Sequence, residues 1–336
     1  MKLPPDLKCP THEEVLGTNG ASGRVEDAPE LVCPRGCRFP IVNEIPRFVK
    51  SEHYASAFGK QWNVFSQTQL DSYTKQPIFV TRLTRALGES LETLRGKSVL
   101  EAGCGAGNFT ELFLAAGAHV FACDLSSAVD ANYANHRTAS NFFICQADIQ
   151  NLPVASASFD YVMCLGVIQH TPNPERTISA LAQCVKPGGT LVIDHYAPNY
   201  PYPLSRRILR PVLLFLPAAI STRLAMALAR VLLQIHKLTW NQRRGIWRLR
   251  GFLKRHSPLV DLYDDLPQLG TKLLGEWSVL VTHDTLTDRY KHLRSVEQIR
   301  ECLEQCGMTE IDAYYGGNGV EARAKRPMVI ATQKSN

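Results

Sequence analysis

Residues 96–196 alternate short apolar runs with segments of helical length, and this alternation constrains the fold more than any other feature. Parallel strands cannot be joined by a tight hairpin, so each pair needs a crossover connection, which is usually a helix. The apolar runs predict five strands, at residues 97–102, 118–124, 141–146, 159–165 and 190–195. The fourth run is almost continuously apolar, as expected for a strand buried on both faces. The alternation therefore predicts a parallel sheet wrapped by helices.

The segments on either side of this core divide the chain of 336 residues into five parts. We predict a small N-terminal segment, a helical linker, the α/β core, a basic helical insert, and a C-terminal part that completes the core. Their ranges are 1–50, 51–95, 96–196, 197–280 and 281–336. In the last part, Ser295 can cap a helix that Gly307 ends. Two more strands, at 309–315 and 328–332, bring the predicted sheet to seven.

A glycine-rich turn follows the first predicted strand and contains Gly103, Gly105 and Gly107. Glycine lets the backbone turn sharply and lets a ligand approach without a Cβ in the way. The helix that follows points its free N–H groups at the same turn. The turn therefore predicts a ligand site at the carboxyl end of the first strand, where α/β sheets bind ligands.

Three acidic residues should converge on that edge of the sheet: Glu101 in the first strand, Asp124 at the end of the second, and Asp148 after the third. Asp124 can accept hydrogen bonds from both hydroxyls of a ribose, and Asp148 can accept one from an adenine amino group. The glycine pattern is G-x-G-x-G, with Asn108 where the nicotinamide fingerprint has its third glycine. Glu101 also suits a cationic amino-acid ligand better than a pyrophosphate. These features favour S-adenosylmethionine (SAM) over a nicotinamide dinucleotide.

The stretch from Val99 to Asn108 resembles motif I of the class I SAM-dependent methyltransferases. Residues 123–126, 146–149, 159–162 and 185–190 are similar, in order, to the later motifs of that superfamily. The resemblance implies a Rossmann-like, seven-stranded methyltransferase sheet that binds SAM. The residues that would hold SAM are Glu101 at the ammonium, directly or through water, Gly103, Gly105 and Gly107 along the methionine, Asp124 at the ribose and Asp148 at the adenine, with Leu125, Ile149 and Leu165 beside them.

The first 50 residues contain four side chains of types that bind zinc: Cys9, His12, Cys33 and Cys37. Four such ligands are enough for a closed tetrahedral site, and a small segment with little core gains stability from a metal. Residues 39–48 resemble the tail of Trm112-like zinc-ribbon domains, which are often fused to methyltransferases. The pattern departs from theirs, because His12 replaces the usual second cysteine and the second pair is spaced by three residues. A metal-free knuckle of buried cysteines is the alternative to structural zinc.

The positive charge of the chain, a formal net +6, is concentrated in the predicted insert. Residues 201–260 contain twelve Lys and Arg residues and no Asp or Glu. A helix at about 218–238 would carry apolar residues on one face and basic residues on another. Such a helix can cover a substrate pocket as a lid or cap, or lie on an anionic membrane surface. Contact with nucleic acid is a third alternative, which the sparse aromatic residues disfavour.

Methyl transfer mainly requires that the acceptor is oriented and water excluded, although an oxygen or carbon acceptor can also need a base. The candidates for that base are His170, His195 and Tyr196, with His283 and Asp284 arriving from after the insert. His170 is the first choice because it follows the strand that should face the methyl group; the alternative is a histidine that only shapes the turn. The resemblance also implies that the aromatic segment at 58–65 folds over the cofactor. The alternative is an amphipathic helix that only packs on the sheet.

We therefore predict an enzyme that transfers a methyl group from SAM to a small-molecule or lipid-like acceptor, similar to ubiquinone and menaquinone methyltransferases. The alternatives are an RNA or translation-factor methyltransferase, a non-enzymatic SAM-binding scaffold, and a nicotinamide-dependent oxidoreductase. Cysteines inside predicted strands indicate a reducing compartment, and we expect neither a signal peptide nor a membrane-spanning segment. The expected location is cytoplasmic, with membrane-surface contact through the insert left open.

Overall fold

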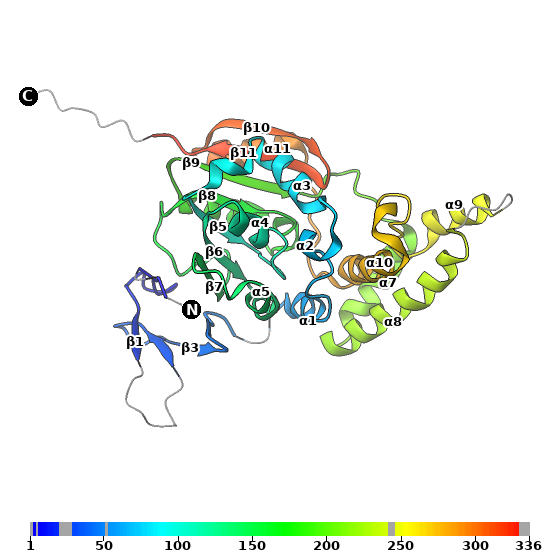
Figure 1. The fold of residues 1–336 in the computed structure, drawn as a ribbon, viewed down its shortest axis with the longest axis horizontal. Coiled ribbons are helices and arrows are strands. Elements are labelled where there is room, and N and C mark those ends of the chain that lie inside the picture. Colours follow the sequence, from blue (N-terminus) through cyan, green and yellow to red (C-terminus); the bar gives the residue numbers. More distant parts are fainter. Residues whose placement is uncertain (1–2, 5, 20–28, 51–52, 241–245, 329–336) are drawn as a thin grey trace, which may run out of the picture.

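The computed structural model describes residues 3–4, 6–19, 29–50, 53–240 and 246–328. Its centre is a seven-stranded sheet with the strand order β10-β11-β9-β8-β5-β6-β7 (Figure 1). The strands are β5 (Ser98–Ala102), β6 (His119–Asp124), β7 (Phe142–Gln146), β8 (Phe159–Cys164), β9 (Val185–His195), β10 (Thr309–Gly316) and β11 (Gly319–Lys325). Strands β5 to β9 are parallel, whereas β11 is antiparallel to both of its neighbours. The predicted seven-stranded Rossmann-like α/β class is confirmed.

Helices cover both faces of the sheet because its central strands are apolar on both sides. Along β5, Leu100 packs into one core with α6 (Pro174–Cys184) and α11 (Val296–Gln305). The preceding residue, Val99, packs into a second core on the other face. The helices of that second face are α3 (Ile78–Leu87), α4 (Thr110–Ala115) and α5 (Ala128–His136). The strand order reverses at β5, which opens a crevice at the carboxyl ends of β5 and its neighbours.

The helix caps read from the sequence are present. The Ser295 side chain accepts a hydrogen bond from the Gln298 amide, and the Gln298 side chain returns one to the Ser295 amide, which makes a capping box. Gly307, with φ of 74°, follows the end of that helix in the left-handed region. These local signals place α11 within one residue of the expected range.

The last strand of the sheet differs from the prediction. We expected a strand at 328–332, of which residues 329–332 lie outside the described residues. The strand that completes the sheet is β11, and it pairs with β9 from Val320 opposite His195 to Lys325 opposite Thr190. Its small apolar residues alternate with charged ones, so it presents a weak strand signal. Its charge is accommodated because buried Glu321 forms an ion pair of 2.6 Å with Arg85 on α3.

The N-terminal segment is a four-stranded antiparallel sheet that sits against the edge strand β7 and against α5 (Figure 1). Its strands are β1 (Gly17–Asn19), β2 (Glu30–Val32), β3 (Arg38–Val42) and β4 (Ile45–Pro46). The Phe48 amide donates to the Gln146 carbonyl at 2.8 Å, and Arg47 forms an ion pair of 2.6 Å with Asp130. The segment is therefore joined to the edge of the large sheet.

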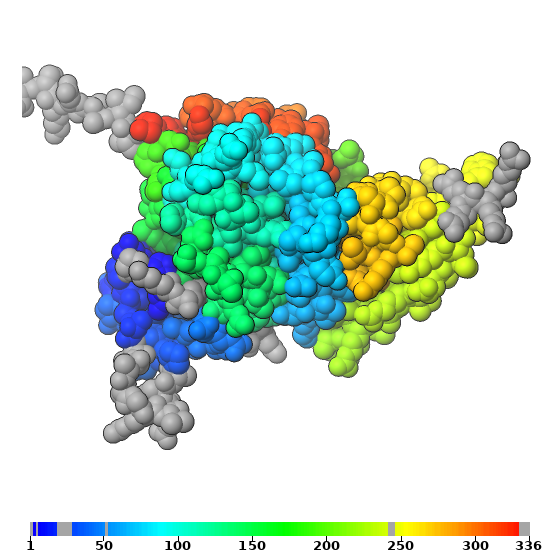
Figure 2. Space-filling view, viewed as in Figure 1, coloured from blue at the N-terminus to red at the C-terminus, as the bar shows by residue number. Residues whose placement is uncertain are grey.

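The insert consists mainly of helices that project from the side of the core (Figures 1 and 2). They are α7 (Leu204–Phe215), α8 (Ala218–Lys237), α9 (Trp247–His256) and α10 (Gly270–Thr287). The predicted boundary at residue 280 falls inside α10. By length and composition alone, α8 could cross a membrane, with a mean hydropathy of 1.4 over an 18-residue window of which 33% is buried. We expected no such segment because we required an uncharged apolar stretch of about 18 residues, and α8 contains Arg223 and Arg230.

Candidate functional site

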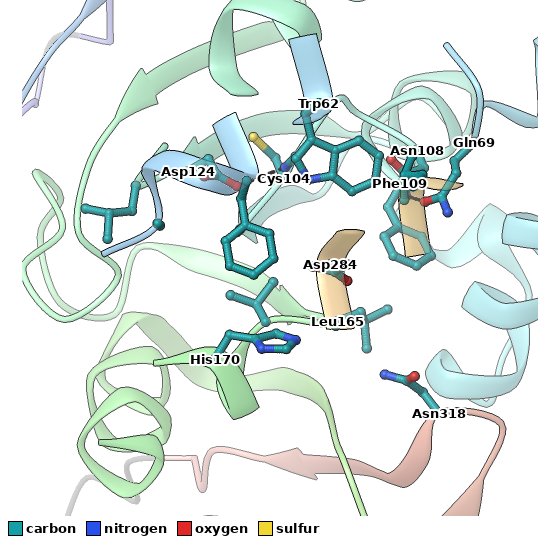
Figure 3. Close-up of a pocket in the computed structure, with 18 of the residues that line it drawn as sticks. Trp62, Gln69, Cys104, Asn108, Phe109, Asp124, Leu165, His170, Asp284 and Asn318 are labelled. Atoms are coloured by element: carbon teal, nitrogen blue, oxygen red, sulfur yellow. Dashed lines mark hydrogen bonds between the residues drawn. The ribbon is translucent and has the colours of Figure 1, made fainter. Parts of the chain in front are cut away.

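A cavity of about 340 Å³ lies at the carboxyl ends of the central strands (Figure 3). One side is formed by the strand ends and the turns after them. The other sides are formed by α1 (Ser56–Val64), α3 and α10. Of the residues predicted to hold SAM, the cavity is lined by Gly103, Gly105, Asp124, Leu125, Asp148, Ile149 and Leu165. Their individual roles stay predictions.

The glycine turn needs glycine for two different reasons. Gly103 has φ of 80°, and a Cβ there would lie 2.4 Å from the Val167 side chain, which also lines the cavity. Gly107 has φ of 98°, and a Cβ there would lie 2.5 Å from the His136 ring. Gly107 does not line the cavity in this structure, where the absence of a Cβ makes room for α5 to pack behind the turn, and its contact with the methionine part stays a prediction.

The carboxylate of Asp124 is held in place by backbone and side-chain donors. Its Oδ2 accepts from the Gly105 amide at 3.0 Å, and its Oδ1 accepts from the Ser126 amide at 2.8 Å and the Ser126 hydroxyl at 2.7 Å. Asp148 is held in the same way, because its Oδ1 accepts from the Gln150 amide at 2.9 Å. Two oriented carboxylates therefore face the cavity from neighbouring strands (Asp124 in Figure 3).

Glu101 lies deeper than the cavity wall. It is buried, and one of its carboxylate oxygens accepts a hydrogen bond from the Thr110 hydroxyl. Burial raises the pKa of Glu101 to about 8. Glu101 does not line the cavity, so a direct contact with an ammonium is not present in this geometry. A cation bound nearby would lower the pKa again and restore the carboxylate.

The aromatic segment before the core lies over the glycine turn (Figure 3). Phe58 and Trp62 on α1 both line the cavity, and a Cβ on Gly105 would lie 3.3 Å from the Trp62 indole. The helix is fixed there because the Asn63 side chain donates to the Ser127 carbonyl at 2.9 Å. The placement agrees with the segment folding over the cofactor site.

An apolar wall faces the strand ends across the cavity. Phe79 on α3 stacks on Trp277 of α10, with ring centroids 6.0 Å apart and an angle of 9° between planes. Leu280 and Val281 continue this wall along α10. The sequence analysis missed it because α10 buries polar residues such as Ser278 and Thr282 as well as apolar ones, so the sequence shows no distinct apolar face.

Arg82 and Asn318 are two polar residues of the cavity that the sequence did not reveal. The Arg82 guanidinium forms an ion pair of 2.5 Å with buried Asp194, and the Asn318 side chain donates to the same carboxylate at 3.2 Å. The three residues come from α3, the β10–β11 turn and β9, so only the tertiary fold brings them together. The charge of Arg82 is therefore neutralised at the cavity wall.

His170 and Asp284 are the two predicted base candidates with polar atoms in the cavity that lack partners (Figure 3). The His170 Nδ1 lies 3.1 Å from the Tyr290 carbonyl and 3.3 Å from the carboxylate of Asp288, while its buried Nε2 has no partner among the described residues. Asp284 Oδ1 is buried and likewise has no partner in the described part of the chain. Burial raises the pKa of Asp284 to about 6.

The other three candidates are placed differently. Tyr196 lines the cavity, but its ring stacks on Tyr200 at 4.1 Å between centroids. His195 lies outside the cavity, its Nδ1 is 3.0 Å from the Tyr196 carbonyl, and burial lowers its pKa to about 4. His283 also lies outside and contacts the Gln61 side chain. His195 is a buried residue at the end of β9, and its catalytic role stays a prediction.

The four predicted metal ligands come together in the N-terminal segment. The ligand atoms of Cys9, His12, Cys33 and Cys37 all lie within 4.8 Å of one another. The His12 Nδ1 is 3.8, 3.4 and 3.6 Å from the three sulfur atoms, in that order. A tetrahedral zinc with Zn–S of about 2.3 Å and Zn–N of about 2.05 Å requires an N···S separation of roughly 3.6 Å. The three N···S separations are therefore close to those of a tetrahedral zinc site.

Residues 100–193 match the family described as "Methyltransferase domain". The ubiquinone biosynthesis O-methyltransferase of Coxiella burnetii (strain RSA 493 / Nine Mile phase I) is 35% identical over 111 residues, which cover 32% of this chain and 47% of that protein. The protein of the same name from Aromatoleum aromaticum is 34% identical over 120 residues, with the same coverage. The chain thus spans about half the length of the curated relatives it matches.

Solved structures are similar at low identity. Magnesium protoporphyrin IX methyltransferase from Synechocystis PCC 6803 is 16% identical, with a TM-score of 0.39 over 80% of this chain and 83% of that one. The complex of the Haloferax volcanii Trm112 methyltransferase activator with a methyltransferase is 14% identical, with a TM-score of 0.43 over 83% of this chain and 99% of that one. The similarity of this chain to methyltransferases therefore rests on the sequence match of residues 100–193.

Proposed function

We propose that this chain, whose residues 100–193 match the family described as "Methyltransferase domain", is a class I SAM-dependent methyltransferase that transfers a methyl group from SAM to a small-molecule or lipid-like acceptor. One observation carries the proposal: a single cavity joins the glycine turn and its carboxylates to an apolar wall that contains Asp284, whose Oδ1 has no partner among the described residues. A cofactor and an acceptor bound in that cavity would lie next to each other. Closeness and orientation are the main requirements of methyl transfer.

The residues at the strand ends fit SAM. Gly103 and Gly105 line the cavity, so a ligand bound there would contact the backbone of the turn. Asp124 would accept from the ribose and Asp148 from an adenine amino group, a proposal supported by the hydrogen bonds that hold both carboxylates at the cavity wall. Trp62 covers the turn and would exclude water from the sulfonium. When bound, SAM supplies a methyl group that is already activated by its sulfonium.

The acceptor side favours a largely apolar molecule with a group that loses a proton. Phe79, Trp277 and Leu280 would bury its apolar part, because they line the cavity opposite the cofactor edge. Asp284 is the base in this proposal: with a pKa of about 6 it is ionised at neutral pH and can take a proton from an acceptor hydroxyl. The name of the curated relatives, O-methyltransferases, supports an oxygen acceptor.

Incubation with methyl-labelled SAM and fractionated cell extract tests the proposal. We expect the label in the lipid or small-metabolite fraction. Label that enters only RNA or protein would contradict the acceptor class and favour the RNA or translation-factor alternative. If calorimetry on folded protein detects no binding of SAM or S-adenosylhomocysteine, the proposal fails as a whole.

For the N-terminal segment we propose a structural zinc ion held by the three cysteines and His12. The separations of the four ligand atoms support it. Because the four protein side chains would fill all four coordination positions of a tetrahedral zinc ion, no position would be open for catalysis. Elemental analysis of protein purified without added metal should find about one zinc per chain. A value near zero, with the segment still folded, would favour the metal-free knuckle.

A further inference from the structure

Helix α8 is packed against the protein with its smaller and more polar side chains inward. Its buried residues are Ser221, Thr222, Ala225, Met226, Ala229, Leu233 and His236. Its exposed apolar residues are Ile220, Leu224, Val231, Ile235 and Leu238, each between 43% and 76% exposed. At 100° per residue these five side chains fall within an arc of about 60°, opposite the buried face. A helix that only covered a core would bury its branched aliphatic residues instead.

Helix α7 has the same arrangement. Its exposed apolar residues are Leu204, Ile208, Val212 and Phe215, and Phe215 is 92% exposed. They fall within an arc of about 80° on the helix. α7 and α8 pack on each other and on α10. Each of the two helices therefore carries an apolar stripe that faces away from the protein.

Basic residues border both stripes. Arg223 and Arg230 are exposed, lie along one edge of the α8 stripe, and pair with no described carboxylate. Arg207 is exposed beside the α7 stripe. The stretch 201–260 has no acidic residue that could neutralise them. An apolar stripe with a positive border matches the hydrocarbon edge and the headgroups of an anionic lipid layer.

We propose that the α7 and α8 stripes dock this protein on the surface of an anionic membrane, with both helices lying in the interface. The helices lie in the interface and do not span the bilayer in this proposal, because Ala225 and Ala229 on the inner face of α8 are fully buried and α8 packs on α10. Docking adds a property beyond methyl transfer. It also places a membrane next to α10, whose other side forms the apolar wall of the cavity through Trp277, Leu280 and Val281.

Two other occupants fit the stripes less well. In a symmetric dimer each stripe would meet its own copy, and the arginines along it would meet arginines with no acidic partner in the stretch 201–260. Nucleic acid binds through aromatic stacking as well as charge, whereas the α8 stripe is wholly aliphatic. A lipid surface satisfies both the aliphatic side chains and the charge.

Flotation of the full chain with vesicles of phosphatidylcholine containing about 30% phosphatidylglycerol tests the proposal. We expect at least about tenfold stronger binding than to pure phosphatidylcholine, and a loss of binding at high salt. The double variant Leu224→Glu/Val231→Glu should bind at least about tenfold more weakly than wild type, because two inserted aliphatic groups are lost. The matched control is Val42→Glu, at a site on β3 that is 46% exposed, which should bind like wild type.

The outcomes separate docking from its rivals. Wild type that stays unbound to anionic vesicles overturns the proposal, and so does a double variant that binds as well as wild type. A stable dimer in sedimentation that the double variant disperses, without vesicle binding, would instead identify a self-association surface. Circular dichroism and calorimetric SAM binding should be the same for both variants and wild type. Because flotation needs no SAM or acceptor, its result is independent of the proposed methyl transfer.

Discussion

Asp284 should destabilise the fold at neutral pH, and its removal should stabilise the protein. The carboxyl group sits in the apolar wall of the cavity with a pKa of about 6, raised from 3.8 by burial. The charged neighbours that act on it are His170 and Lys291, which lower the pKa, and Asp288, which raises it. Replacement by Asn keeps the shape of the side chain and removes the charge.

The magnitude follows from the shift. A shift of about two pKa units corresponds to about 3 kcal/mol. The pKa of Asp284 is 3.8 in the unfolded chain and about 6 in the folded protein, so the unfolded state ionises first. The free energy of unfolding therefore falls as the pH rises from 3.8 through 6, and the stability present below pH 3.8 is lost above pH 6. The stabilisation by Asp284→Asn should therefore be about 1.5 kcal/mol at pH 5 and at most about 3 kcal/mol at pH 8, since cavity water screens part of the charge.

Guanidinium unfolding of wild type and Asp284→Asn at pH 5, 6, 7 and 8 measures this difference. The control is Val281→Ala, which alters the same wall without a titratable group, so its difference from wild type should stay constant with pH. If the stability gained by Asp284→Asn were equal at pH 5 and pH 8, the carboxyl group would have an ordinary pKa. The reasoning from burial at the cavity wall would then be wrong.

Four further predictions concern activity and binding. Asp284→Asn should lower kcat about 10²- to 10⁴-fold and leave the calorimetric affinity for SAM unchanged, because a base acts on the acceptor; an unchanged kcat would remove Asp284 from the reaction. Asp124→Ala should weaken SAM binding at least about 100-fold by loss of two charged hydrogen bonds, and normal binding would show that the ribose lies elsewhere. Gly103→Ala should destabilise the fold by about 1–3 kcal/mol in thermal unfolding, because it combines a positive φ with a clash against Val167; an unchanged melting temperature would contradict this. Cys33→Ser should remove zinc and make the N-terminal segment sensitive to protease while SAM affinity stays within about twofold; retained zinc would show that other ligands suffice.

The cofactor edge could be predicted because its signals are local. Gly103, Asp124 and Asp148 each lie at the end of a strand or just beyond it, and parallel strands bring their carboxyl ends to one edge whatever the details of packing. Which residues line the cavity could not be predicted in the same way. Gly107, Glu101 and His195 carry the expected residue types, but Gly107 packs against α5 and the other two are buried away from the cavity.

The sequence by itself determined the order of strands and helices in residues 96–196, the capped ends of α11, and the grouping of four metal-binding side chains, because each depends on neighbours in the chain. Only the tertiary structure decided which side chains meet across the cavity. Arg82, Asp194 and Asn318 lie on three separate elements, and the unusual pKa of Asp284 arises from the packing of α10. The orientation of α8 is the clearest case: amphipathicity identifies two faces of a helix, but the partner it packs against decides which face is left for water or lipid.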